Sequence, residues 1–205
     1  MSTPATDLNP PLAQPSVVVR PSRDADVPAM LAIYLHHIRK GVDPNYDGEY
    51  DAPDADDLKR RRKNMQRGRL PHVVAEQAGV VLGYAYAVPF RKRPAYRFAL
   101  KHSIYIHVDY QHVGIGRQLL PALIDACAAA GFHQMIGYID GANQASLRLH
   151  EACGFERAGL LKAVAFKYGR WNDSVLVQRA LVRAEAEGDA PRHPDDIAKP
   201  SPPSP

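Results

Sequence analysis

A glycine-containing segment near the middle of the chain has the composition of an anion-binding turn. A strand-like run ends at Asp109, and the residues from Gln111 to Arg117 read Gln-His-Val-Gly-Ile-Gly-Arg before an amphipathic stretch. The first main-chain N–H groups of a helix lack partners within the helix and lie at the positive end of its dipole, so they attract phosphate. Gly114 and Gly116 would let the main chain approach such a group closely. From this segment alone, an ordinary glycine-containing helix start is the alternative.

A second set of polar residues falls on one face of a predicted helix. Asn143, Ser146 and His150 stand at positions i, i+3 and i+7, so a helix would present all three to one ligand while Leu149 and Cys153 face the core. An imidazole with a pKa of about 6.5 can move protons near pH 7. The alternative for His150 is an ordinary, partly buried helix histidine.

Two basic runs have different interpretations. The run from Arg91 to Arg93, followed by Tyr96, would suit an acidic small molecule, and a solvated hairpin end is its alternative. The run from Lys59 to Lys63 lies in a polar helical stretch and favours a solvated helix face.

The elements that must position these residues follow from hydrophobic periodicity and turn residues. Apolar residues at helical spacing end at Gly131, which suits a left-handed helix cap. The loop from Lys40 to Pro53 has no periodicity and is a candidate for a place near the substrate. The element order βααβββαβαββ predicts an α/β fold with a mixed, mostly antiparallel sheet flanked by helices. The expected strands lie at 17–20, 72–76, 80–88, 102–109, 135–139, from 155 onward and near 174–181, and the expected helices at 24–38, 54–67, 119–131 and 145–153.

Length and composition fit one soluble domain. The chain has 205 residues, of which 45% are hydrophobic and 23% charged, and its formal net charge of +4 is too small to indicate nucleic-acid binding. Proline-rich ends predict disordered tails at 1–16 and 184–205 around a domain at 17–183.

The remaining features argue against secretion, membrane insertion and metal binding. The longest apolar stretch, Val80 to Phe90, is about half of the roughly 20 residues that a membrane helix needs, and the N-terminus does not read as a secretory signal. Cys127 and Cys153 are expected to be reduced residues of the core, and no metal-ligand spacing of Cys or His occurs. We therefore expect a cytoplasmic protein without a metal.

On these motifs the chain resembles the GNAT superfamily of N-acetyltransferases. The acyl-CoA signature of that superfamily is Arg or Gln, two residues, Gly, one residue, then Gly or Ala, and the segment from Gln111 to Gly116 is similar to it throughout. The downstream pattern N-x-x-S-x-x-L-H-x-x-x-G-F, which begins at Asn143, resembles a second element of the superfamily.

Within that superfamily the chain is most similar to the phosphinothricin and methionine-sulfone N-acetyltransferase group, over roughly residues 17 to 181. His150 stands where the wider superfamily commonly has Tyr and this group has His. The segments that carry the resemblance are 83–87, 90–96, 102–106, 149–152 and 166–173.

The resemblance implies a wedge between two splayed strands that receives acetyl-CoA as cosubstrate, with the acceptor entering from the opposite side. It implies acceptor contacts by Arg91, Lys92, Arg93 and Tyr96, and His150 near the sulfur. The implied cosubstrate contacts are Ile104, Tyr105, Ile106, His112, Val113, Gly114, Ile115, Gly116, Arg117, Asn143 and Ser146.

Lys101 departs from the group's pattern, which usually has a glutamate there as the presumed general base. An ordinary lysine has a pKa of about 10.4, so use as a base at pH 7 would cost roughly 4 to 5 kcal/mol unless burial lowered that pKa. Lys101 is therefore a candidate catalytic residue if burial lowers its pKa, and otherwise a candidate either for binding a substrate carboxylate or for a solvated side chain. A substrate amine with a pKa near 8 is about one-tenth neutral at pH 7, so it needs less help from a base.

Three functions stay open at this point. The first is an acetyl-CoA-dependent N-acetyltransferase that acts on a small amino-acid-like amine by direct attack on the thioester. The second is a protein or peptide N-acetyltransferase. The third is a non-catalytic acyl-CoA-binding module, because Lys101 replaces the usual glutamate. A small-molecule amine is the expected partner, together with a second copy of the chain, since enzymes of this group are often homodimers; no nucleic-acid or membrane partner is expected.

Overall fold

The computed structural model describes residues 16–39, 53–167 and 169–181. In this part of the chain the element order βααβββαβαββ is confirmed, with three short 3₁₀ turns added. The strands are β1 (Val18–Pro21), β2 (His72–Gln77), β3 (Val80–Pro89), β4 (Ala99–Ile106), β5 (Gln134–Asp140), β6 (Glu156–Lys167) and β7 (Arg170–Ala180). The helices are α1 (Val27–Arg39), α2 (Ala55–Arg67), α3 (Ile115–Ala129) and α4 (Gln144–Ala152), and the 3₁₀ turns are η1 (Asp24–Asp26), η2 (Pro94–Tyr96) and η3 (Val108–Tyr110).

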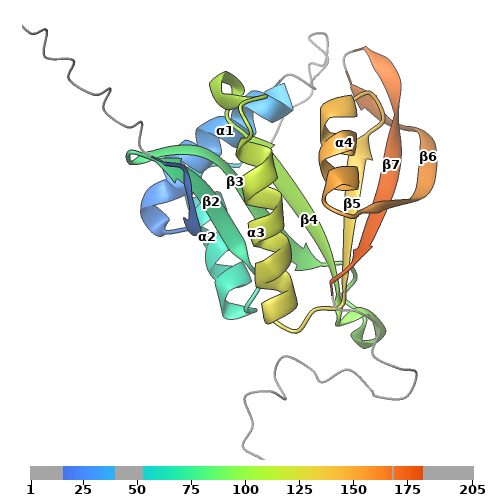
Figure 1. Ribbon diagram of the computed structural model, residues 1–205, viewed down its shortest axis with the longest axis horizontal. Coiled ribbons are helices and arrows are strands. Elements are labelled where there is room, and N and C mark those ends of the chain that lie inside the picture. Colours follow the sequence, from blue (N-terminus) through green and yellow to red (C-terminus); the bar gives the residue numbers. More distant parts are fainter. Residues whose placement is uncertain (1–15, 40–52, 168, 182–205) are drawn as a thin grey trace, which may run out of the picture.

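One sheet contains the seven strands in the order β1-β2-β3-β4-β5-β7-β6. Neighbouring strands are antiparallel except β4 and β5, which are parallel, so the predicted mixed and mostly antiparallel sheet is confirmed. Helices α3 and α4 lie over one face of the sheet, and α1 and α2 lie over the other (Figure 1).

The sheet opens between β4 and β5. Only three residue pairs join the two strands, and the last of them is Lys101 with Ile136. Beyond this pair the strands separate toward the end at which α3 begins (Figure 1). The edge of β4 from Ser103 to Ile106 therefore lacks a strand partner on the β5 side, which leaves main-chain groups for another molecule.

Two apolar cores hold the helices to the two faces. The larger core lies under α3 and α4 and includes Leu100, Leu119 and Leu123, each fully buried. The smaller core lies under α1 and α2 and includes Met30 and Tyr84. Successive residues of β4 therefore alternate between two different environments.

The structure moves some predicted boundaries. β4 runs over residues 99–106 rather than 102–109, because the chain turns into η3 at Val108. The last strand begins at Arg170 rather than near Ser174, because β6 and β7 form one long hairpin. Gly131 has a φ of 84° directly after the helix, which confirms its predicted conformation at the end of α3.

Some predictions fall outside the described residues. Nearly all of the loop from Lys40 to Pro53 and of the two predicted tails lies there, so the domain limits at 17 and 183 stay a prediction. Among the described helices, none has the length and apolar composition that would be needed to cross a membrane.

Candidate functional site: a cavity at the opening of the sheet

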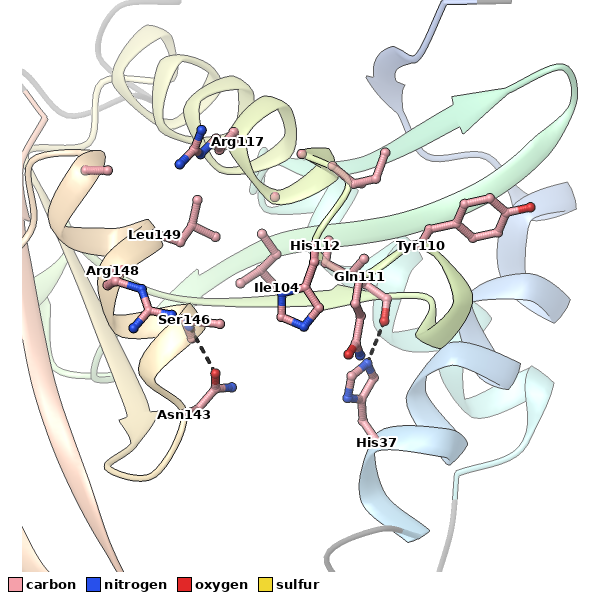
Figure 2. A pocket seen from close by; sticks show the side chains of 16 residues that line it. His37, Ile104, Tyr110, Gln111, His112, Arg117, Asn143, Ser146, Arg148 and Leu149 are labelled. Atoms are coloured by element: carbon pink, nitrogen blue, oxygen red, sulfur yellow. Dashed lines mark hydrogen bonds between the residues drawn. The ribbon is translucent and has the colours of Figure 1, made fainter. Parts of the chain in front are cut away.

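A cavity of about 560 Å³ lies where β4 and β5 separate, between the start of α3 and α4 (Figure 2). Its volume is in the range of small-molecule sites. The lining residues come from α1, β4, the glycine turn, α3 and α4. They are His37, Ile104, Ile106, Tyr110, Gln111, His112, Gly114, Ile115, Gly116, Arg117, Asn143, Ala145, Ser146, Arg148, Leu149 and Ala152.

The glycine turn has the backbone that its sequence predicts. Gly114 caps the start of α3 with a φ of 91°, in the left-handed region that favours glycine, and His112 has a φ of 64°. A Cβ at Gly116 would lie 2.9 Å from Leu149 Cδ2, so this glycine lets the first turn of α3 approach α4. Gly114, Ile115 and Gly116 of this first turn line the cavity together with the exposed Arg117.

The open edge of β4 forms the floor of the cavity. Ile104 and Ile106 line it, whereas the ring of Tyr105 lies on the opposite face of the sheet, 5.1 Å from the ring of Tyr84. His37 of α1 lies with its Nε2 2.7 Å from the carbonyl oxygen of Ile106, and so donates a hydrogen bond to it (Figure 2). A helix from the other layer thus fixes the end of the open strand.

The start of α4 forms the third wall. Asn143 caps the helix, since its side-chain oxygen accepts a hydrogen bond from the Ser146 N–H at 3.0 Å (Figure 2). Arg148 is exposed on the same helix and lines the cavity, so Arg117 and Arg148 place positive charge on two of its walls. Two guanidinium groups beside a helix start suit a ligand that carries phosphate groups.

His150 lies deeper than the helix pattern predicts. Its side chain is 2% exposed, and it lies behind Ser146 and not among the residues that line the cavity. Its Nε2 is 2.9 Å from the Nε2 of His102, which is 6% exposed on β4. Burial lowers the pKa of both imidazoles, and for His102 burial together with the charge of His150 lowers the pKa to about 3.

The basic segment after β3 lies at the other end of β4 from the glycine turn (Figure 1). Arg91, Lys92 and Arg93 are exposed, and Tyr96 is half-buried. The Arg91 guanidinium lies 5.3 Å from the ring centre of Phe90 and 5.1 Å from that of Tyr96. These cation–π contacts order a positive surface that stands apart from the cavity.

Lys101 is exposed and pairs with Val88 and Ile136 at the point where the sheet opens. Because side chains alternate along a strand, Lys101 points to the face opposite the one that holds His102. Ser103 and Tyr105 lie on the same face as Lys101, and Tyr105 packs against the core under α1. Lys101 therefore stands on the α1 side of the sheet.

The cavity unites most of the residues predicted to contact the cosubstrate. Those that line it are Ile104, Ile106, His112, Gly114, Ile115, Gly116, Arg117, Asn143 and Ser146. Tyr105, Val113, His150, Lys101 and the segment from Arg91 to Tyr96 do not line it. The functional roles of all these residues stay predictions.

Sequence reasoning missed His37, Tyr110 and Arg148 as lining residues. Arg148 could have been found, because it is a cation between Ser146 and His150 in the downstream motif. His37 could not have been found from the sequence, because the helix that carries it contains no motif that indicates a binding or catalytic role. Within the described residues, no group of three or more His, Cys, Asp or Glu side chains is arranged to hold a metal ion.

The comparisons with known proteins agree with this geometry. The profile of the acetyltransferase (GNAT) family matches residues 35–155. The phosphinothricin N-acetyltransferase of Alcaligenes faecalis is 47% identical over 171 residues, which cover 83% of this chain and 85% of that protein. The L-methionine sulfoximine/L-methionine sulfone acetyltransferase of Pseudomonas aeruginosa PAO1 is 34% identical over 169 residues, 81% of this chain and 95% of that protein.

A solved structure is similar over nearly the whole described fold. A phosphinothricin acetyltransferase from Sinorhizobium meliloti in complex with acetyl-CoA superposes with a TM-score of 0.79 at 38% identity, covering 88% of this chain and 96% of that one. The family resemblance found in the motifs is confirmed, as are the enzyme class and the cosubstrate predicted with it. The chain belongs to the acetyltransferase (GNAT) family.

Proposed function

We propose that the protein transfers an acetyl group from acetyl-CoA to the amine of a small amino-acid-like acceptor of the phosphinothricin or methionine-sulfone type. The observation that carries the proposal is the separation of β4 from β5 directly in front of the glycine turn. Relatives named for those two acceptor types, at 47% and 34% identity, support the acceptor class.

The cosubstrate would lie along the open edge of β4. The main-chain groups of Ile104, Tyr105 and Ile106 would pair with the amide-bearing arm of acetyl-CoA, as a strand partner would. The turn from His112 to Arg117 would surround the pyrophosphate, with the side chains of Asn143 and Ser146 closing the other wall. Arg148 would add a positive charge to the same ligand.

The reaction would be direct attack. The neutral amine nitrogen attacks the thioester carbonyl, the resulting oxyanion is stabilised by main-chain donors, and the C–S bond then breaks. The thiolate that leaves needs a proton, and His150 is the side chain proposed to supply it. No bond between enzyme and acetyl group is required.

The acceptor would approach from the face of the sheet opposite α3 and α4. Lys101 stands on that face at the opening of the sheet, and the exposed Arg91, Lys92 and Arg93 follow the neighbouring strand. Four positive side chains favour an acceptor that carries a carboxylate or phosphinate. Lys101 is exposed, and its role would be to attract the acceptor.

We also propose a homodimer. The hairpin of β6 and β7 exposes a set of large apolar side chains, and an exposed patch of this kind is typical of a protein–protein interface. The set consists of Leu160, Leu161, Val164, Phe166 and Trp171, each at least 42% exposed. A dimer should dissociate in Leu160→Glu with Phe166→Glu, which analytical ultracentrifugation would detect.

A cytoplasmic location completes the proposal. Cys127 and Cys153 are both free, as expected for a protein of a reducing compartment.

The function is tested by binding and turnover together. Calorimetry should show CoA and acetyl-CoA binding to the purified protein, and thiol release should rise above background with phosphinothricin or methionine sulfone. Release with peptides alone would instead favour a protein acetyltransferase. Tight CoA binding without release on any amine would favour a binding module, and no association at millimolar CoA would overturn the proposal.

A further inference from the structure

Two buried histidines meet ring to ring beside the opening of the sheet. His102 comes from β4 and His150 from α4, and their Nε2 atoms are 2.9 Å apart, which is a hydrogen-bond distance. His102 is the first residue of β4 after the last pair with β5. The two rings therefore lie where the strands begin to separate.

The other nitrogen of each ring faces a main-chain carbonyl. His102 Nδ1 is 3.0 Å from the Ile136 oxygen, and His150 Nδ1 is 2.7 Å from the Ser146 oxygen. A carbonyl oxygen only accepts hydrogen bonds, so each Nδ1 must carry a proton to form these contacts.

Counting protons gives one too few for a neutral pair. A neutral imidazole has one N–H, and in both rings it is used at Nδ1. Both Nε2 atoms would then present lone pairs to each other at 2.9 Å. Three hydrogen bonds in a row need three protons, whereas two neutral imidazoles supply two.

The neighbouring hydroxyl does not remove this shortage. Ser146 Oγ is 3.4 Å from His150 Nδ1 and could donate to it, but the Ser146 carbonyl oxygen is nearer, at 2.7 Å. A bare Nδ1 would place its lone pair against that oxygen. The same repulsion would arise at Ile136 if His102 gave up its Nδ1 proton instead.

We propose that His102 and His150 share one additional proton between their Nε2 atoms and act as one unit, in which His102 is the positioning residue that sets the orientation and protonation of His150. The proposal rests on the proposed function for its role in catalysis, but the shared proton follows from the geometry alone. A charge spread over two rings and two carbonyl contacts forms charge-assisted hydrogen bonds, which are stronger than neutral ones.

The surroundings are shaped for this pair. A Cβ at Gly137 of β5 would lie 2.9 Å from His102 Cε1, so the glycine makes room for the ring. The ring of Phe155 lies 5.1 Å from each imidazole. Gly137, Phe155 and Val177 of β7 carry no charge, and Lys101 points to the other face of the sheet.

This enclosure limits the pair to one additional proton. Burial opposes charge on either ring and lowers the pKa of both, so the pair holds the additional proton at pH 7 only because the Nε2–Nε2 hydrogen bond and the two carbonyl contacts offset that penalty. The proton balance of the reaction then closes. The C–N bond forms and the C–S bond breaks, the thiolate takes a proton from the Ser146 hydroxyl, which lines the cavity, and that hydroxyl takes one from His150 Nδ1, 3.4 Å away. The new amide nitrogen loses one proton to water, and the pair regains one from water.

The direct test is nitrogen NMR of the full-length protein with ¹⁵N-labelled histidine, at pH 7 and without ligand. We expect both Nδ1 atoms to be protonated and both Nε2 atoms to show intermediate shifts from a shared proton. His102→Gln and His150→Gln assign the signals. A bare Nδ1 beside a fully protonated Nε2 in either ring would overturn the proposal, whatever the enzyme's activity.

Kinetics test the positioning role. In His102→Leu we expect kcat to fall at least tenfold with the KM for acetyl-CoA unchanged within about twofold, and His102→Gln, which keeps a polar partner for His150, should recover part of the loss. In the pH profile of kcat, the alkaline limb should move in His102→Gln. It should not move in His72→Gln, which changes a buried histidine of β2 outside the pair. Wild-type kcat in His102→Leu would refute the role. If NMR shows the shared proton but the protein acetylates no amine, the proposed function is refuted and the shared proton is not.

Discussion

The cavity at the glycine turn and the segment expected to hold the acceptor lie at opposite ends of β4, and they are built differently. The cavity is formed largely by main chain, from the open edge after Lys101 and the turn around Gly114. The acceptor segment consists of exposed side chains from Arg91 to Arg93 on a short connection. Backbone geometry is fixed by the fold, whereas exposed side chains change with little cost to folding.

The difference indicates at which end of the site mutations can change substrate specificity. In the proposed binding mode, a diphosphate-bearing cosubstrate would be bound by main-chain N–H groups, which every residue except proline carries, so the glycines would matter more than the side chains around them. An acceptor is distinguished by charge and shape, which depend on the side chains present. The two ends of the site should therefore respond independently to mutation.

The largest effect on binding is expected at the cavity. In Gly116→Val the new Cβ would meet Leu149, itself a lining residue, at 2.9 Å, and the added methyl groups would separate α3 from α4. We expect CoA affinity measured by calorimetry to fall about a hundredfold, or about 2.7 kcal/mol, with the fold retained by circular dichroism.

The matched control for that change is Gly159→Val in β6, because a Cβ at Gly159 meets no atom within 4 Å. It should bind CoA as the wild type does. Equal CoA affinity in both variants would mean that the close approach of α3 and α4 does not shape the cosubstrate site.

Local motifs made the cavity end predictable. The turn around Gly114 and the cap at Asn143 depend on residues near each other in the sequence, so their conformations could be predicted from residue type. The element order followed from hydrophobic periodicity, and the ends of β4 and β7 were misplaced because strand pairing, rather than local pattern, decides where a strand stops.

Contacts between distant segments could not be predicted in this way. His37 reaches Ile106 across 69 residues, and His102 meets His150 across 48. The sequence pattern put His150 on the ligand face of its helix, and Asn143 and Ser146 of that face do line the cavity, but His150, one turn further on, is buried with Leu147. Helical spacing gives the faces of a helix, whereas the tertiary fold decides which face is buried.

A comparable effect, on stability instead of binding, is expected on the acceptor side of the sheet, where His72 stacks on Tyr84. Burial, together with the charge of Arg62, lowers the pKa of His72 to about 4. The unfolded chain takes up this proton near pH 6.5, so the contribution of His72 is complete above that pH and is lost as the pH falls toward 4. The free energy of unfolding should drop by about 3 kcal/mol from this residue over that interval.

Urea unfolding between pH 7 and pH 4 checks the effect, with His72→Phe as the test. The variant keeps an aromatic ring in the stack, and its stability should vary less with pH than that of the wild type by about 3 kcal/mol. His133→Phe, which changes a half-buried histidine elsewhere, should keep the wild-type dependence. The histidine pair is present in all three proteins, so it cancels from the difference. Identical pH curves for wild type and His72→Phe would contradict the prediction.

A third effect separates the two ends of β4 directly. Replacing Arg91 and Arg93 together by Gln removes two exposed positive charges from the acceptor segment. We expect the KM for phosphinothricin to rise about tenfold, since partly exposed charge pairs each contribute up to about 1 kcal/mol. The affinity for CoA should not change. The same double change at Arg61 and Arg67, exposed on α2, is the control and should leave both constants as they are. A loss of CoA affinity in the Arg91 and Arg93 variant would end the distinction between the two ends.

The smallest effect is expected at Lys101, on the boundary between the two ends. Because its side chain is exposed, its attraction for an acidic acceptor is screened by water, and Lys101→Glu should raise the KM for phosphinothricin only about fivefold. The kcat should stay within about twofold, since the proposed role of Lys101 is to attract the acceptor and not to take part in the proton transfer. Lys162→Glu, a change of the same charge at an exposed position of β6, should leave the KM unaltered. A hundredfold fall in kcat would make Lys101 part of the proton transfer. A large gain in turnover on phosphinothricin would show that a glutamate suits this acceptor better than the native lysine does. The natural acceptor would then not be a glutamate analogue.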